Sequence, residues 1–315
     1  MIIAGAGLAG LIAGNIFRNY SPRIIERQTS LPNNHRAILR FRDHSVSKAP
    51  GIEFKKVKVR KAIAYKGNWL SRSNPKVANL YSIKVTGKVQ SRSCWNLNDA
   101  ERYISPDDFI MRIAKGLTIN YNETLHKSMF DGQPIISTIP MPAMMDIVGW
   151  KEKPDFPFRS IWSCWCEIVD YDISVNQTIY YPDLKDPYYR ASLLGNKLIL
   201  EYNQEPWQAP EDVLSVLMND FGINSKIKNL NVKKQKFGKI SAIDDNLRKE
   251  FLYYLTREFN VYSLGRFATW KQIILDDDVV DDANKIMKLI NVENKRRNYH
   301  VNMTIMNGEL NDSKS

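Results

Sequence analysis

The sequence predicts an α/β fold in which a layer built from both ends of the chain carries an inserted antiparallel β-sheet. The first 26 residues follow the pattern strand, glycine-rich turn, helix, strand, with apolar residues at 1–4 and 24–25. In the middle, residues 158–202 are rich in aromatic and β-branched side chains, which is typical of successive strands. Near the other end, a short apolar stretch at 261–264 precedes a helical pattern at 277–290, so both ends are expected to join one layer.

Between these segments, the expected elements follow the hydrophobic pattern. Residues 52–65 and 77–89 are interpreted as strands, because β-branched residues alternate there with Lys and Arg. Ser105 is expected to cap a helix that runs to about Lys115, since Pro106 and two acidic residues occupy its first turn. The remaining expected elements are strands at 117–121 and 134–139 and helices at 211–219 and 244–258.

This order of elements predicts two domains. Residues 1–154 and 241–315 are expected to form a discontinuous first domain, and residues 155–240 an inserted sheet domain. The length of 315 residues, with 43% hydrophobic and 25% charged residues, suits a globular protein of one large or two moderate domains. The apolar run at 1–17 lacks a charged start and is too short to span a membrane, so we expect neither a signal peptide nor a membrane protein.

The cysteines and histidines argue against a disulfide framework and against a metal site. There are three cysteines without a Cys-x-x-Cys pair, which is typical of a reducing compartment, and we expect a cytoplasmic protein. Cys164 and Cys166 fall on one face of an expected strand and are interpreted as core residues. The four histidines form no pair with the spacing of metal ligands, so no metal is expected.

Positive charge is concentrated in residues 51–100. This segment holds eight Lys and three Arg against one Glu and one Asp, so its formal charge is 11 − 2 = +9, most of the +11 of the whole chain. Such a segment attracts polyanions or a phosphate-bearing substrate, and a contact with nucleic acid is one interpretation. The other interpretation, a solvated basic face without a partner, stays open.

The glycine-rich turn carries the dinucleotide-binding pattern Gly-x-Gly-x-x-Gly between a strand and a helix. Gly5 permits the tight turn, Gly7 lets the main chain approach a pyrophosphate, and Gly10 lets the helix lie close to the sheet. Glu26 follows Gly5 by 21 residues and is expected to bind the adenosine ribose, which disfavours a 2′-phosphate. The alternative is a tightly packed turn that binds no ligand. Further candidate cofactor-binding residues are Leu8, Ala9, Arg27 and Thr138.

Three segments resemble a known group of flavoproteins. They are IIAGAGLAGLIAGNIF…IIER, YYPDLKDPYYRASLLGNKLILEY and YSLGRFATWKQIILDDDVVDDA. The sequence is similar to the FAD-dependent family of amine oxidases, protoporphyrinogen oxidases and UDP-galactopyranose mutases. It also resembles short FAD-dependent oxidoreductases of bacteriophages, some associated with modified thymines in phage DNA, for which the location would be the host cytoplasm. The resemblance implies a Rossmann-like FAD-binding domain with an inserted antiparallel β-sheet substrate domain.

The resemblance assigns roles to the carboxyl-terminal motif. Gly265 would place main-chain N–H groups near the flavin pyrophosphate or ribityl chain, and Arg266 would lie beside the flavin or a substrate phosphate. The alternative for Arg266 is an ion pair with Asp276 or Asp277. Trp270 is a candidate cofactor contact at a position where the mutases tend to have Tyr. The following helix would direct its amino end at the flavin ring.

The middle segment provides the candidate catalytic residues, Arg190 and Tyr181. A guanidinium near the flavin could bind an anionic substrate group in a bidentate manner. The alternative for Arg190 is an ion pair with Glu201 on a neighbouring strand. Tyr180 and Tyr181 alternate between faces of their strand, so one of them should point inward.

The resemblance also implies that the irregular residues 29–50 reach towards the cofactor, as this loop does in related flavoproteins. Arg36 is a candidate contact for the FAD phosphates or the adenine, with Arg40 and Arg42 as further possibilities. Taken together, the sequence predicts an FAD-dependent oxidoreductase acting on an amine-type substrate, which could be linked to a nucleotide or to DNA. Two alternatives stay open, a nucleotide-sugar mutase that uses reduced FAD and an FAD-loaded nucleic-acid-binding module without catalysis.

Overall fold

The structure is a computed structural model that describes residues 1–31, 40–171, 173–272 and 274–292. These residues divide into two compact units. Unit 1 holds the described residues within Met1–Leu31, Ile110–Lys153 and Asn246–Ser315. Unit 2 holds those within Pro32–Phe109 and Pro154–Asp245. No helix within the described ranges has the length and apolar character that a membrane crossing requires.

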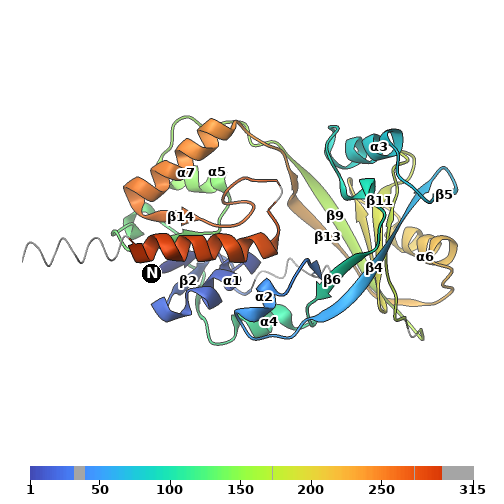
Figure 1. The fold of residues 1–315 in the computed structure, drawn as a ribbon, viewed down its shortest axis with the longest axis horizontal. Coiled ribbons are helices and arrows are strands. Elements are labelled where there is room, and N and C mark those ends of the chain that lie inside the picture. The colour runs from blue at the N-terminus through green and yellow to red at the C-terminus, as the bar shows by residue number, and fades with distance from the viewer. Residues whose placement is uncertain (32–39, 172, 273, 293–315) are drawn as a thin grey trace, which may run out of the picture. The chain divides into compact units, whose positions relative to one another are not determined.

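Unit 1 is built on a five-stranded sheet in which every pair of neighbouring strands is parallel. In spatial order the strands are β14 (Val261–Ser263), β8 (Ile135–Ser137), β1 (Ile2–Ala4), β2 (Arg23–Glu26) and β7 (Thr118–Tyr121). The helices are α1 (Leu8–Ile16), α4 (Phe109–Ala114), α5 (Met141–Val148), α7 (Asp245–Phe259) and residues 276–292, the last drawn in red in Figure 1. Short 3₁₀ turns follow at η1 (Arg18–Tyr20) and η3 (Lys127–Met129).

The strand order of unit 1 places β1 in the middle of its sheet. β1 pairs with β2 on one side and with β8 on the other, and its residues Ile2 to Ala4 are buried. Because all strands are parallel, their carboxyl ends meet at one edge, where the turn after β1 lies. This confirms the predicted strand, turn, helix and strand at the start of the chain.

Unit 2 is a nine-stranded mixed sheet. The strands, in spatial order, are β13 (Ile227–Ile240), β9 (Phe158–Ile168), β12 (Lys197–Tyr202), β11 (Tyr188–Leu194), β10 (Asn176–Tyr180), β4 (Lys55–Tyr65), β6 (Ala100–Ile104) and β3 (Arg40–Phe41), with β5 (Asn68–Leu70) beside β4. Its helices are α2 (Ser45–Lys48), α3 (Pro75–Thr86) and α6 (Ala209–Asp220), with the 3₁₀ turn η2 (Ser93–Trp95). The long strands β9 and β13 run side by side in Figure 1.

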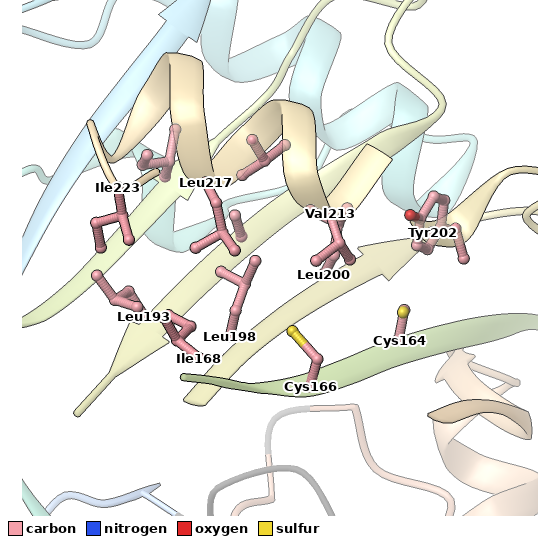
Figure 2. Packing of buried hydrophobic residues seen from close by; sticks show 14 of the residues in the cluster. Cys164, Cys166, Ile168, Leu193, Leu198, Leu200, Tyr202, Val213, Leu217 and Ile223 are labelled. Carbon is pink, nitrogen blue, oxygen red and sulfur yellow. The ribbon is translucent and has the colours of Figure 1, made fainter. Parts of the chain in front are cut away.

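The two faces of this sheet have separate cores. On one face α6 packs Val213, Val216 and Leu217 against strand residues that include Leu198 and Leu200 (Figure 2). Cys164 and Cys166 belong to this core and are fully buried, as the strand pattern predicts. The other face packs against α3, whose buried residues include Val77, Ala78, Tyr81 and Val85.

One sequence expectation for unit 2 is wrong. Residues 77–89 are not a strand, because Pro75–Thr86 forms α3. Asn74 caps this helix by accepting a hydrogen bond from the Val77 amide at 3.1 Å, and Gly87 ends it in a left-handed conformation. The predicted antiparallel insert is confirmed, because the strands within residues 155–240 pair antiparallel; β4, from outside this range, joins β10 in a parallel register.

The boundaries of the compact units differ from the predicted domain boundaries. Residues 40–109 lie in unit 2, whereas the sequence assigns them to the first domain. The reason is strand pairing, because β4 joins β10, and β6 and β3 extend the sheet beyond β4. The predicted helix from Ser105 also begins later, at Phe109, after a turn at residues 107–108.

Candidate functional site

The turn after β1 is held by main-chain hydrogen bonds. The Gly5 amide donates to the Ile25 carbonyl at 2.9 Å, and the Thr138 hydroxyl donates to the Ala4 carbonyl at 2.8 Å. Gly5 has a φ of +99°, and a Cβ there would stand 2.6 Å from Thr138 Oγ1. Glycine is therefore required at this position for conformation and for space. Thr138 supports the turn, and its predicted contact with a cofactor stays a prediction.

Gly7 leaves the amino end of α1 open. It is the N-cap residue, with φ −66° and ψ 174°, and no side chain caps the helix there. A Cβ built on Gly7 would meet no atom of the described residues within 4 Å. The amide groups of Leu8, Ala9 and Gly10 belong to the first turn, where helix geometry provides no partner within the helix. This end of α1 can therefore hold an anion that approaches the main chain closely.

Gly10 and Gly14 allow α1 to pack closely against its surroundings. A Cβ on Gly10 would collide with the carbonyl oxygen of Gly5, and one on Gly14 would stand 2.8 Å from Ile24 Cδ1 and 2.9 Å from Leu117 Cδ1. Gly10 thus fits the helix to the turn that precedes it, and Gly14 fits it to the sheet. Gly10 packs closely, against the turn at Gly5 rather than against a strand, and its part in cofactor binding stays a prediction.

Glu26 links the end of β2 to the glycine-rich turn. Its Oε2 accepts a hydrogen bond from the Ala6 amide at 2.8 Å, and its Oε1 accepts one from the Gln28 amide at 2.9 Å. Glu26 is 6% exposed, so the structure places a carboxylate beside the turn, inside the unit. Each carboxylate oxygen has room for further hydrogen bonds, because an ionised carboxyl group offers about four acceptor positions. The ribose contact stays a prediction.

The structure brings the carboxyl-terminal motif to the first turn of α1. The Leu264 amide donates to the Ser137 carbonyl at 2.8 Å, which continues the pairing of β14 with β8. Gly265 follows with a φ of +87°, and a Cβ there would stand 3.1 Å from Ala9 Cβ. Residues 265 and 9 are thus neighbours although more than 250 positions separate them in the sequence. Two motifs found separately in the sequence therefore form one site.

Arg266 lies close enough to Asp276 to influence its ionisation. Burial and the nearby Asp277 raise the pKa of Asp276, Arg266 opposes the shift, and the net result is a pKa of about 6. Arg266 therefore acts electrostatically on Asp276, and both its ion pair and its contact with a flavin stay predictions. Trp270 is 1% exposed and has a φ of +46°, so it belongs to the core of unit 1.

The other predicted cofactor contacts include three arginines, Arg27, Arg36 and Arg40. Arg27 follows Glu26 and is exposed. Arg36 lies outside the described residues. Arg40, a further possibility for the cofactor phosphates, lies in unit 2, where its guanidinium donates to hydroxyl groups of the sheet. In the described part of the chain there is no group of three or more His, Cys, Asp or Glu that could hold a metal ion.

Arg190 forms the ion pair that the sequence left open as its alternative role. In the register of β11 and β12, Arg190 stands opposite Glu201, and its Nε donates to Glu201 Oε2. Glu201 Oε1 also accepts a hydrogen bond from the Tyr189 hydroxyl at 3.1 Å. Burial favours protonation of Glu201, but Arg190 and the hydrogen bonds outweigh it and lower the pKa of Glu201 to about 2.

Tyr181 lies on the other face of the sheet from Arg190. Its hydroxyl donates to Asp220 Oδ2 at 2.8 Å, and its ring belongs to the core beneath α6. Tyr180 pairs with Arg190 in the register of β10 and β11, and directly opposite residues share a face. The structure therefore does not bring together the two predicted catalytic residues, and Tyr180 is the tyrosine on the Arg190 face.

The sequence analysis missed two polar residues that share this face, Thr178 and Ser192. They lie opposite each other on β10 and β11, are 3% and 2% exposed, and both accept hydrogen bonds from Arg40. A signal was present in the sequence, because Thr178 directly precedes Ile179 and Ser192 lies between Ala191 and Leu193. It could not be interpreted without the pairing of the strands.

The positive charge of residues 51–100 is partly compensated in the structure. Lys56 pairs with Glu101 at 2.9 Å, and Lys58 pairs with Asp99 at 3.0 Å. Lys84 is 4% exposed and donates to the carbonyl of Tyr181, so its charge does not face a polyanion. The contact of this segment with nucleic acid stays a prediction.

The fold is that of Rossmann-like FAD-binding oxidoreductases, as the sequence predicts. The chain is similar to the structure of reduced UDP-galactopyranose mutase, with a TM-score of 0.69 and 12% identity over 92% of this chain and 93% of that one. It is similar to a protein from Exiguobacterium sp. 255-15 described as a protoporphyrinogen oxidase, with a TM-score of 0.63 and 10% identity over 93% and 98% of the two chains.

A third similar structure contains the cofactor itself. It is aklavinone-11 hydroxylase in a ternary complex with FAD and aklavinone, with a TM-score of 0.52 and 11% identity over 93% of this chain and 62% of that one. No protein-family model matches the sequence, and no curated protein matches it either. At these identities the likeness establishes the fold, and the activity has to be argued from the site.

Proposed function

We propose that this chain is an FAD-dependent oxidoreductase that holds FAD in unit 1. The observation that carries the proposal is the open, uncapped amino end of α1, with Glu26 on one side and Gly265 against Ala9. A dinucleotide fits this arrangement, because the helix end offers N–H donors and a positive dipole to a diphosphate. The absence of a side chain at Gly7 leaves room for the diphosphate to approach the main chain.

Different residues of unit 1 would contact different parts of the cofactor. The amides of Leu8 and Ala9 would donate to the diphosphate, and Glu26 would accept hydrogen bonds from the adenosine ribose. Gly265 would let the carboxyl-terminal motif lie close to the same turn. FAD supplies the acceptor for a hydride from a C–H bond, such as the one next to an amine nitrogen. The chain supplies binding, orientation and the exclusion of water around the reacting groups.

We propose an amine-type substrate. The oxidation of an amine by a flavin requires little acid–base chemistry from the protein, since the free amine is the reactive form. The basic residues 51–100 support a version of this proposal in which the substrate is linked to a nucleotide or to DNA, as in phage thymine modification. In that case substrate binding would weaken steeply with increasing salt.

The second candidate function is that of a nucleotide-sugar mutase. It is favoured by the likeness to reduced UDP-galactopyranose mutase, which extends over more than nine-tenths of both chains. The assay is turnover of UDP-galactopyranose by protein reduced with dithionite. Turnover under these conditions, without net oxidation of any amine, would support the mutase function. It would contradict the proposal that the protein oxidises amines.

The cofactor proposal is tested by the absorbance spectrum of the purified protein and of its Gly7→Val variant. Flavin absorbance bands at about 375 and 450 nm are expected in the wild type. They should be lost in the variant, because the new valine side chain would occupy the space through which the diphosphate approaches the main chain. Val is compatible with the backbone at Gly7, so the variant is expected to fold. Gln208→Val, at the N-cap of α6 in unit 2, is the control and should keep its flavin.

Two results would contradict the proposal. A folded Gly7→Val protein that keeps all its flavin would show that the cofactor is held elsewhere. The second result has two parts: the wild type binds flavin that no amine reduces, and it shifts the electrophoretic mobility of DNA in a salt-sensitive manner. This result would instead favour the nucleic-acid-binding module without catalysis.

A further inference from the structure

Arg40 lies at the start of β3, and its guanidinium bridges two other strands of unit 2. Its Nη1 donates to Thr178 Oγ1 on β10 at 3.0 Å, and its Nη2 donates to Ser192 Oγ on β11 at 3.2 Å. Thr178 and Ser192 face each other in the register, and their hydroxyl oxygens are 3.4 Å apart. Both partners are uncharged, so neither of them neutralises Arg40.

A second guanidinium lies on the same face of the sheet. Tyr180 and Arg190 form the next pair of residues on this face, two positions along from Thr178 and Ser192, which corresponds to about 7 Å. Arg190 is already paired with Glu201. Glu201, the carboxylate whose charge acts on Arg40, is thus paired with another arginine.

The surroundings of Arg40 are therefore positively charged. Burial, Arg190 and Arg102 lower the pKa of Arg40 while Glu201 and Tyr180 raise it, and the net result is a pKa of about 10. These groups comprise three guanidiniums and one carboxylate, so their formal charges sum to 3 − 1 = +2. Holding such an excess of charge in a partly buried position is costly unless an anion offsets it.

We propose that Arg40, Thr178 and Ser192 form a binding site for a carboxylate or phosphate group. A guanidinium has five N–H donors in a planar fork, which suits the paired oxygens of either group, and the two hydroxyls use only part of this capacity. Each hydroxyl that accepts from Arg40 can donate its own hydrogen to the same anion. Binding of the anion is a property of unit 2 and does not require FAD; only its use in holding a substrate rests on the proposed function.

The test is isothermal titration calorimetry of the full chain with inorganic phosphate and, separately, with acetate. Chloride keeps the ionic strength constant, so a general salt effect is excluded. The wild type is expected to bind at least one of the two anions, and Arg40→Gln to weaken that binding at least tenfold. Arg60→Gln removes an exposed arginine of β4 in the same unit and should leave the affinity unchanged.

Arg40→Lys covers the case in which Arg40→Gln does not fold. Lysine keeps the charge but lacks the planar fork, so the affinity should fall several-fold. Binding by either variant that equals the wild type would overturn the proposal, as would the absence of binding to both anions. Flavin absorbance, read in each sample, should not change; its loss in Arg40→Gln would assign Arg40 to the cofactor and would also overturn the proposal. Anion binding by a wild type that holds no flavin would refute the proposed function alone.

Discussion

Glu201→Gln is expected to destabilise unit 2 because it leaves the partly buried Arg190 without its counter-charge. The pKa of Glu201 is lowered from 4.5 to about 2, a difference of about 2.5 pH units, which corresponds to about 3 kcal/mol at 1.36 kcal/mol per unit. The loss of one partner of a buried ion pair falls in the same range, about 3–5 kcal/mol. Glu201 is 8% exposed, so solvent screens the pair little.

The pH dependence of this effect has a definite sign. Because the folded state lowers the pKa of Glu201, its contribution is complete above pH 4.5 and is lost as the pH falls towards 2. The assay is urea unfolding followed by the fluorescence of Trp162 and Trp165, which lie on β9 next to β12. At pH 7 the variant should unfold at a clearly lower urea concentration, and the difference should shrink in acid.

Two further variants separate the buried pair from a general effect of charge. Glu101→Gln makes the same change in the exposed pair with Lys56 and should move the midpoint far less. The double variant Glu201→Gln, Arg190→Met removes both charges and should recover most of the lost stability. If Glu201→Gln unfolds like Glu101→Gln at pH 7, the reasoning about Arg190 is refuted.

Three other substitutions test local features. Gly10→Ala should cost about 3 kcal/mol, because the new methyl group meets the Gly5 carbonyl; an unchanged thermal midpoint would contradict this. Asn74→Ala should cost about 1 kcal/mol by removing the cap on the Val77 amide, measured by urea unfolding. Asp276→Asn should stabilise by up to about 3 kcal/mol at pH 7, since burial raises the pKa of this group to about 6. Wild-type stability should fall as the pH rises from 4 to 6 and then level off, and in the variant this fall should be absent.

The sequence was sufficient where the structure is set by local geometry. The glycine-rich turn, α1 and β2 follow from residues within one stretch, and the positions of Gly5 and Gly10 are fixed by a backbone angle and by a close approach. Cys164 and Cys166 were assigned to the core by strand alternation alone. These features need no knowledge of distant partners.

The sequence was insufficient where the outcome depends on the pairing of distant strands. Residues 77–89 contain alternating β-branched residues, but Asn74 and Pro75 start a helix that buries one side against the sheet. Arg190 had two possible roles, and only the register opposite Glu201 distinguishes them. The partners of Arg40 come from two strands more than 130 positions away, which no local pattern indicates.

The parallel pair of β4 and β10 has a consequence for synthesis of the chain. Residues 55–65 cannot complete their strand pairing before residues 176–180 are made, β1 likewise needs β8, and β8 needs β14. A nascent chain that ends near residue 150 would therefore present unpaired strand edges to its surroundings. Neither sheet can complete its strand pairing on the ribosome until most of the polypeptide has emerged. Folding is therefore expected to be slow and to depend on protection of the strands that are made early.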